Sequence, residues 1–297
     1  MVRVRMLTWA AVVAVFLLMS IGNVVSATGS GLACPDWPLC HGSVIPPLRP
    51  DVLIEYSHRL VAALASILIV ATIVMAMRRS GQPATRRMGW TLLVLLGAQI
   101  GLGGITVLLK LPDLISTAHL VNALLIFGGL LVLAASERGA ATPAAGIARL
   151  ARAGLGALLV QLALGGYVRH SGAGLACPDF PLCSGAVLPG HWLAVAHWTH
   201  RWLGVLLLGL FVHLGMAGRG TPLRRATSAA ALLAVVQVAL GIATVLLRLD
   251  PPIRAAHAAV GYALWGAVVW TAARSGAVSL LTVPRRAAKS VPEARLA

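Results

Sequence analysis

The sequence predicts an all-α membrane protein in which eight transmembrane helices form two four-helix bundles related by a pseudo-two-fold axis. Three observations lead to this prediction. First, 59% of the 297 residues are hydrophobic and only 11% are charged, whereas soluble domains carry about 25% charged residues. Second, several stretches reach the roughly 20 apolar residues that a helix needs to cross a bilayer. Third, a long internal repeat divides the chain into two similar halves.

The apolar stretches define eight expected spans, and the first of them needs separate justification. A basic start, an apolar run and the tripeptide "VSA" at 25–27 are also typical of a cleaved signal peptide. The second half has a matching span at 153–169, and an internal helix cannot be a signal peptide. We therefore expect the first span to be retained. The expected spans lie near residues 7–26, 53–77, 89–109, 116–136, 153–169, 193–217, 227–247 and 255–273.

The segments between the spans alternate in charge, and this pattern predicts the orientation of the chain. Basic residues gather before the first span, after each even-numbered span and in the C-terminal tail. Arginine and lysine mark the cytoplasmic side, so we expect both termini inside and the chain in the plasma membrane. The net charge of +16 is explained in this way and does not indicate a nucleic-acid partner. Most of the eight acidic residues fall in segments expected outside: Asp36, Asp51, Glu55, Asp113, Asp179 and Asp250.

Two polar segments that contain cysteine reveal the internal repeat. "GLACPDWPLC" at 31–40 returns as "GLACPDFPLC" at 174–183, and "GAQIGLGGITVLLKL" at 97–111 returns as "VVQVALGIATVLLRL" at 235–249. Each copy holds an even number of spans, so the two copies are parallel repeats. Short connections favour an up-down helical bundle for each copy. The expected domains are an N-terminal bundle at 1–137, a cytoplasmic linker at 138–152, a C-terminal bundle at 153–273 and a basic cytoplasmic tail at 274–297.

The cysteines form two closely spaced pairs, Cys34 with Cys40 and Cys177 with Cys183. Both pairs fall on the side expected outside, where disulfides persist. Nearby prolines bend each segment and help to bring the Cα atoms within the roughly 4.4–6.8 Å that a bridge requires. We therefore predict two disulfides, each within its own loop. Each disulfide either fixes the shape of its loop or takes part in redox chemistry near a cofactor. A zinc site is not expected, because the cysteine spacing differs from that of zinc sites.

Four histidines lie just inside apolar spans at matching depths, where ionisable side chains are costly and often functional. His58 and His119 belong to the first half, and His200 and His257 to the second. Two imidazoles that meet across a four-helix bundle suit a six-coordinate haem iron. The alternative for such a histidine is a hydrogen bond between helices, but the pairing and duplication favour haem ligands. The histidines without repeat partners are expected in loops or at the membrane interface: His41, His170, His191 and His213.

The two halves differ one turn before the first histidine of each pair. Glu55 lies at this place in the first half and His197 in the second. Residues three apart share a helix face, so Glu55 lies beside His58. A carboxylate beside only one site is typical of a proton-handling group in a catalytic half. The alternative is an ion pair between Glu55 and Arg59 four residues later, and both roles are compatible. Arg59 and Arg201 each follow a histidine and are candidates for contacts to haem propionates.

These residues resemble the haem A synthase family. The resemblance rests on "TGSGLACPDWPLCHG" at 28–42, "EYSHR" at 55–59, the matched His119 and a second, diverged copy, and it covers about residues 7–273. It implies a membrane oxidoreductase that oxidises the porphyrin methyl group of haem O to a formyl group. The product, haem A, would serve haem-copper oxidases.

The resemblance also implies a division of roles between the two bundles. The N-terminal bundle is expected to hold the substrate haem near Glu55, His58 and His119. The C-terminal bundle is expected to hold haem b between His200 and His257 and to pass electrons to a quinone. The expected partners besides lipid and haem O are a haem O synthase and cytochrome oxidase assembly factors. A substrate haem has to leave its site, so one first-half histidine is expected to be an exchangeable ligand, and the sequence does not say which.

Two other function classes fit parts of this pattern. A non-catalytic diheme membrane cytochrome that relays electrons to or from quinone needs the same four histidines, but it has no need for a carboxylate in only one half. A transporter built on repeats is expected to contain broken helices near the middle of the membrane. The spans of this chain instead carry their polar groups near one face. Enzymatic oxidation of haem O is therefore the predicted function.

Overall fold

The computed structural model describes residues 2–139, 142, 144–278 and 280, and these residues form an all-helical structure. Eight α-helices follow one another along this part of the chain, and a short 3₁₀ turn, η1 (Ala173–Leu175), lies between the fifth and the sixth. The α-helices are α1 (Val2–Ala27), α2 (Pro50–Arg79), α3 (Pro83–Leu108), α4 (Asp113–Ser136), α5 (Ala145–His170), α6 (Trp192–Ala217), α7 (Arg224–Leu246) and α8 (Pro251–Ser275).

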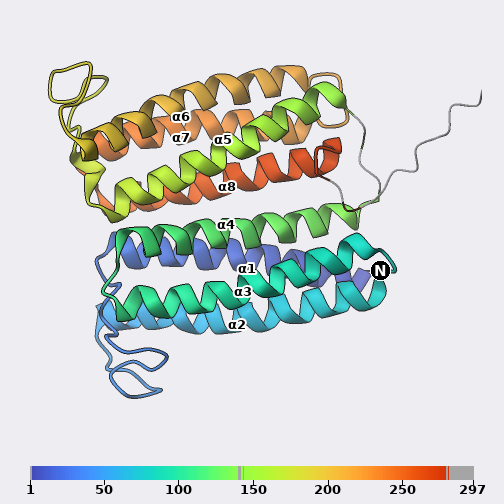
Figure 1. Ribbon diagram of the computed structural model, residues 1–297, viewed down its shortest axis with the longest axis horizontal. Helices are drawn as coiled ribbons and strands as arrows, with labels where there is room; N and C mark the ends of the chain where they lie inside the picture. The colour runs from blue at the N-terminus through green and yellow to red at the C-terminus, as the bar shows by residue number, and fades with distance from the viewer. Residues whose placement is uncertain (1, 140–141, 143, 279, 281–297) are drawn as a thin grey trace, which may run out of the picture.

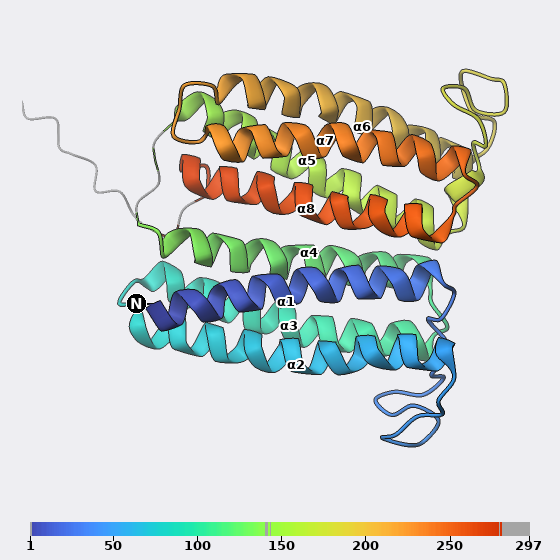
Figure 2. The same ribbon diagram turned by 180° about the vertical axis from the view of Figure 1, so that it is seen from behind.

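The helices lie side by side in two groups (Figures 1 and 2), with α1 to α4 in one and α5 to α8 in the other. In the first group, α1 and α3 each pack against both α2 and α4. In the second group, α5 and α7 each pack against both α6 and α8. The groups meet through α4 and α8, with further contacts from α1 to α8 and from α4 to α5. Each half of the chain therefore closes into its own ring of four helices.

Seven of the described helices, α1 to α7, are long and apolar enough to cross a membrane. The chain is therefore a multi-pass membrane protein, as its composition predicts. The remaining helix, α8, is similar in length at 25 residues but is not among these seven. It begins with two prolines and carries Arg254, His257 and Arg274. Seven of the eight expected spans thus meet the requirement of length and composition, and α8 packs among them against α1, α4, α5 and α7.

Most helices extend beyond the apolar spans that the sequence predicts, and α5 shows this most clearly. The helix begins at Ala145, inside the segment 138–152 that was expected to be a linker. Arg149 and Arg152 end the apolar run but not the helix, because arginine is a good helix former. The expected basic tail at 274–297 lies, apart from the end of α8 and the few residues after it, outside the described residues.

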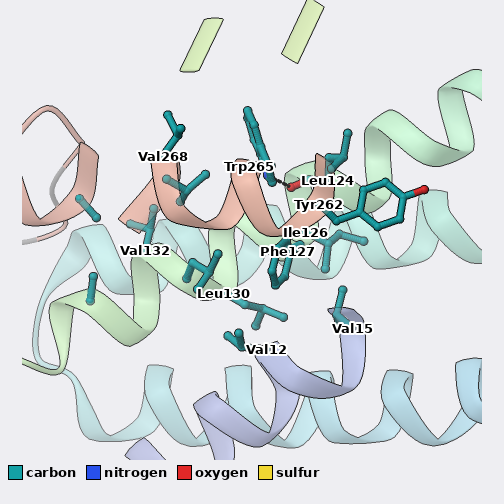
Figure 3. Packing of buried hydrophobic residues seen from close by; sticks show 14 of the residues in the cluster. Val12, Val15, Leu124, Ile126, Phe127, Leu130, Val132, Tyr262, Trp265 and Val268 are labelled. Atoms are coloured by element: carbon teal, nitrogen blue, oxygen red, sulfur yellow. Dashed lines mark hydrogen bonds between the residues drawn. The ribbon is translucent and has the colours of Figure 1, made fainter. Parts of the chain in front are cut away.

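The two groups of helices meet in a packed apolar core (Figure 3). Trp265 of α8 donates its Nε1 hydrogen to the carbonyl of Leu124 in α4, at 2.9 Å. Gly128 of α4 makes room for this indole, because a Cβ added there would lie 3.3 Å from Nε1. Gly266 of α8 makes room for Phe127 in the same way, at 3.2 Å. Small residues let helices approach closely in a membrane, where packing rather than a hydrophobic driving force joins them.

Two arginines of the second half hold the C-terminal end of α1. Arg169 of α5 donates to the side-chain oxygen and to the carbonyl of Asn23, and Arg254 of α8 donates to the carbonyl of Ala27. Asn23 in turn donates to the carbonyl of Ala255 at 3.0 Å. Positive charge is favourable at a helix C-terminus, where backbone carbonyls lack partners. The end of α1 is thus completed by residues of the other half.

The connections between helices repeat an unusual backbone conformation. The turn from α3 to α4 passes through Lys110 and Leu111 with φ of 57° and 64°, and the turn from α7 to α8 passes through Arg248 and Leu249 with φ of 53° and 65°. Left-handed backbone is uncommon for residues other than glycine. Its recurrence at corresponding positions means that the two connections fold alike.

Candidate functional site

The loop between α1 and α2 is closed by a disulfide and fixed by one buried carboxylate. Cys34 and Cys40 are joined with an S–S distance of 1.98 Å, in the predicted pairing. Glu55, in the second turn of α2, accepts a hydrogen bond from the backbone N–H of Cys34 at 2.7 Å. Only 3% of the surface of Glu55 is exposed, so this contact holds the loop against the start of α2 in a site from which water is largely excluded.

Arg59 links Glu55 to the rest of the loop. Its Nη2 lies 2.5 Å from Oε1 of Glu55. The same guanidinium donates through Nη1 and Nη2 to the backbone carbonyls of Cys34, Asp36 and Leu39. The ion pair with the carboxylate and the bonds to the carbonyls together occupy the donors on both terminal nitrogens. A contact from Arg59 to a haem propionate would therefore have to use Nε.

The loop after η1 repeats this arrangement with a histidine in place of the carboxylate. Cys177 and Cys183 form the second disulfide, with an S–S distance of 2.01 Å. His197 Nδ1 lies 3.3 Å from the backbone nitrogen of Cys177, and its Nε2 lies 3.2 Å from Nε of Arg201. Arg201 also donates to the backbone carbonyls of Cys177, Asp179 and Leu182.

Glu55 and His197 therefore occupy the same place, but they satisfy their neighbours differently. A carboxylate has two acceptor oxygens, and Glu55 uses one for Cys34 and the other for Arg59. A neutral imidazole has a single acceptor nitrogen, so His197 accepts from only one of its two neighbouring donors at a time. The first loop is thus held by a complete set of charge-assisted contacts, and the second loop is held by a weaker set.

Each loop also contains an aspartate that binds two backbone N–H groups. Asp36 accepts from His41 and Gly42 at 2.6 and 2.8 Å, and Asp179 makes the corresponding contacts in the second loop at the same distances. The hydrogen bond from Gly42 lowers the pKa of Asp36 below its usual value. The hydrogen bond from Gly185 lowers the pKa of Asp179 in the same way. Both carboxylates are therefore charged at neutral pH and hold their turns closed.

The first loop also reaches α3. A Cβ added to Gly104 would lie 3.1 Å from the indole of Trp37, so this ring packs directly on the helix backbone. Gly104 follows Gly103, which contacts His119. The second half has Ile242 at the position of Gly104. The first loop therefore covers α3 next to His119 through a glycine that the second half lacks.

The four predicted haem ligands all lie against glycines of the preceding helix. A Cβ built on each of these glycines would approach the imidazole more closely than real side chains normally pack. Each imidazole is therefore turned towards the neighbouring odd-numbered helix of its own bundle. The distances to such a Cβ are 2.8 Å for Gly22 and His58, 3.2 Å for Gly103 and His119, 2.7 Å for Gly165 and His200, and 3.1 Å for Gly241 and His257.

Two glutamines outside the set of predicted site residues contact two of these histidines. Gln99 Nε2 lies 3.2 Å from Nε2 of His119, and Gln237 Nε2 lies 3.4 Å from Nε2 of His257. The glutamines occupy the same position in the two copies of the repeat. A polar residue that recurs inside an apolar span is the signal that would have identified them, because such residues are costly in a membrane.

In the second half, the two predicted ligands lie opposite each other. The ring centres of His200 and His257 are 6.5 Å apart. Two histidines that hold one metal ion from opposite sides place their ring centres about 6–7 Å apart, given metal–nitrogen bonds near 2 Å. The residues present therefore fit two histidines that would hold one haem iron.

The histidines without repeat partners make contacts of their own. His41 contacts the carbonyl of Ala33 within the first loop, and His170 lies 3.2 Å from the hydroxyl of Thr117 where α5 meets α4. His191 directly precedes α6. His213 lines a cavity of about 590 Å³ between the start of α5 and the end of α6. The start of α5 and the end of α6 lie at the end of the molecule opposite the α1–α2 and α5–α6 loops (Figure 1), so the cavity that their residues line is not part of the proposed haem sites.

Comparison with known proteins agrees with these features. The chain is similar to a protein named "Heme A synthase" from Symbiobacterium thermophilum, with 32% identity over 285 residues, 90% of this chain and 93% of the relative. Proteins of the same name from Shouchella clausii and Halalkalibacterium halodurans share 31% identity over 250 residues and 35% over 217 residues. These matches cover 78% and 67% of this chain, and 83% and 70% of the two relatives. Residues 5–53 and 48–269 match the model of the COX15-CtaA family, described as "Cytochrome oxidase assembly protein". Because this match includes most of both groups of helices, the chain belongs to the COX15-CtaA family of cytochrome oxidase assembly proteins.

Proposed function

We propose that the protein is a haem A synthase, which oxidises the porphyrin methyl group of haem O to the formyl group of haem A. The relatives named "Heme A synthase" cover most of the chain, and this supports the reaction. The observation that carries the proposal is the asymmetry between the halves. A buried carboxylate, Glu55, lies one turn from His58 in the first half, and a neutral His197 replaces it in the second.

The N-terminal bundle is the proposed catalytic half. His58 and His119 hold the substrate haem, and Glu55 accepts or returns a proton at its edge. The glycine surfaces under both imidazoles support this placement, because they leave room for rings that no larger side chain would allow. Arg59 fixes Glu55 in place through the pair at 2.5 Å.

The C-terminal bundle is the proposed electron-transfer half. His200 and His257 hold haem b, and the 6.5 Å between their ring centres supports this assignment. Haem b supplies reversible one-electron transfer when it is bound. With water as the source of the oxygen atom, oxidation of a methyl group to an aldehyde releases four electrons and four protons, and two molecules of membrane quinone are the proposed acceptors. A haem O synthase and cytochrome oxidase assembly factors are the proposed protein partners.

The same division extends to the architecture. We propose two four-helix bundles, at 1–137 and 153–273, as parallel repeats about a pseudo-two-fold axis, with α8 as the eighth span. The matching helix contacts in the two groups and the matching left-handed turns support this arrangement. The positive-inside pattern supports cytoplasmic termini, a cytoplasmic linker at 138–152, a basic cytoplasmic tail at 274–297 and disulfide loops on the outer side of the plasma membrane.

The experiment that tests the function uses a host that lacks haem A and expresses a haem O synthase together with this chain. The extracted haems are separated by chromatography. We expect haem A from the wild type and from His197→Ala. We expect at least a hundredfold less haem A from Glu55→His. This variant carries the residue of the second half at a position where histidine is compatible with the loop contacts, so it removes the carboxylate with little effect on the fold.

A second candidate function is a non-catalytic diheme cytochrome that relays electrons to or from quinone. The observation that favours it is the shared hydrogen-bond position of Glu55 and His197, which also suits a carboxylate that only holds the loop. The same experiment separates the two functions. Recovery of haem O and haem B alone from the wild type would leave the cytochrome as the function. Haem A formation by Glu55→His at the wild-type rate would assign Glu55 to the loop alone.

A further inference from the structure

Three polar side chains form a continuous hydrogen-bonded network between α3 and α4. Asn122 of α4 donates through Nδ2 to the carbonyl of Leu95 at 2.9 Å and to Oε1 of Gln99 at 2.7 Å. Nε2 of Gln99 lies 3.2 Å from Nε2 of His119. Asn122 lies three residues after His119, on the same face of the helix, and it is buried. The network therefore ends on an imidazole nitrogen of a proposed haem ligand.

The backbone carbonyl of Leu95 fixes the direction of every bond in this network. A carbonyl oxygen only accepts, so the atom of Asn122 that faces it is the amide nitrogen. The atom of Gln99 that faces this nitrogen is then the amide oxygen, and the atom that faces His119 is the amide nitrogen. Gln99 therefore donates to Nε2 of His119. This nitrogen carries the lone pair, and the proton of the neutral ring lies on Nδ1.

The second half keeps the glutamine but lacks the residue that orients it. Val260 occupies the place of Asn122 in the repeat. The side-chain oxygen of Gln237 is buried without a hydrogen-bond partner, and its nitrogen lies 3.4 Å from Nε2 of His257. With no donor at its oxygen, the amide of Gln237 is free to turn away from the imidazole. The two halves thus differ in how firmly a glutamine holds the second histidine.

We propose that Asn122 and Gln99 are positioning residues that make His119 the exchangeable ligand of the substrate haem. This inference rests on the proposed function, and it names the first-half histidine that gives way. Gln99 offers the lone pair of Nε2 a second partner, so His119 moves between the iron and the amide. Because Asn122 fixes the orientation of the Gln99 amide, the amide nitrogen always faces Nε2 of His119 and can bind it in place of the iron. The second half has no residue in place of Asn122 that orients its glutamine, and it retains haem b.

The proposed reaction requires an exchangeable iron ligand in the first half only. Substrate haem enters and product haem leaves in every cycle, whereas haem b stays. Two firm imidazole ligands would retain both haems equally. A neutral hydrogen bond of ordinary net strength lowers the occupancy of the competing iron bond by roughly three- to tenfold. This is enough to speed release without preventing binding.

Haem release from the purified full-length protein tests the proposal, because the type of haem identifies the half. Protein from the host with haem O synthase is mixed with excess apomyoglobin as a haem acceptor, and the haems remaining on the protein are extracted and separated over time. We expect haem O and haem A to leave the wild type faster than haem B. We expect Gln99→Leu to slow their release roughly three- to tenfold, and Asn122→Val to slow it by a smaller factor. Haem B release stays at the wild-type rate in both variants.

Two matched variants in the second half complete the test. Gln237→Leu leaves the release of haem O and haem A unchanged. Val260→Asn supplies the missing donor to the oxygen of Gln237, and we expect it to speed the release of haem B. A spectroscopic readout accompanies these rates: Gln99→Leu raises the low-spin, six-coordinate fraction of the first-half haem. A merely structural role for Gln99 would instead lower the content of both haems.

The outcomes separate this inference from the proposed function. Unchanged or faster release of haem O and haem A from both Gln99→Leu and Asn122→Val would overturn the inference, even if the wild type makes haem A. If Gln99→Leu does not accumulate, Asn122→Val decides alone, because valine is already present at the matching position of the second half. A wild type that makes no haem A and binds no haem O would overturn the proposed function instead.

Discussion

The two halves of the molecule share a scaffold and differ in a few polar positions. Both have a disulfide loop held by an arginine, and both place histidines on glycines. Glu55 is replaced by His197, and Asn122 by Val260. The differences gather around the first-half histidines, where the proposed substrate binds. Under the proposed function, the comparison teaches that the repeated features build the haem sites, whereas the unrepeated ones decide what happens to the haem.

Substitution of a proposed haem ligand is expected to have the largest effect on haem content and to affect one half only. We expect His200→Ala to lose nearly all haem B and to keep its first-half haem, and His58→Ala to do the reverse. Each variant removes one of two imidazoles that hold one iron. Chromatography of haems extracted per mole of purified protein measures the effect. Loss of both haems in each variant would mean that the halves do not bind haem independently.

Removal of the loop arginines is expected to have the next largest effect. Arg59→Met leaves the buried carboxylate of Glu55 unpaired, which destabilises the protein by about 3–5 kcal/mol. Arg201→Met leaves only a neutral His197 and carbonyls without a partner, at a cost of about 1–3 kcal/mol. Thermal unfolding in detergent and protease cleavage of each loop measure the difference. Arg219→Met, at an exposed position, is the matched control, and equal losses from both loop variants would contradict the charge argument.

The glycines under the histidines give a smaller and graded effect. Gly165→Ala and Gly22→Ala would place a Cβ at 2.7 and 2.8 Å from an imidazole, whereas Gly241→Ala and Gly103→Ala would leave 3.1 and 3.2 Å. Forcing an extra methyl group into a packed site costs about 1–3 kcal/mol. We therefore expect Gly165→Ala to lower haem B content more than Gly241→Ala does. The idea fails if both variants retain haem B at the wild-type level.

The smallest expected effect comes from pH, and it should not distinguish the halves. The pKa values of Asp36 and Asp179 are both lowered by backbone hydrogen bonds. A lowered folded-state pKa adds stability above the unfolded value near 3.9, and this stability is lost as the pH falls through the folded value. We expect both loops to stay protected from hydrogen exchange down to about pH 4 and to open together below it. Opening of one loop well above that pH would show that the two turns are not equivalent.

The sequence alone predicts the repeated features of the molecule better than the unrepeated ones. The helices, the repeat and the pairings of Cys34 and Cys177 follow from composition, periodicity and spacing. The contact of Glu55 with the N–H of Cys34 does not follow, because it joins residues far apart in the chain. The same holds for Gln99, whose role depends on the approach of α3 to α4. The helix boundaries near Arg149 were missed because an apolar run marks the membrane and not the helix.

The end of α1 has a consequence for biosynthesis. This helix leaves the ribosome before α5 and α8, yet the guanidinium groups that bind its C-terminal end belong to Arg169 and Arg254 of those two helices. Until α5 and α8 have been inserted, the C-terminal end of α1 lacks these hydrogen-bond donors. The C-terminal end of α1 therefore gains these contacts only after the second half has been translated.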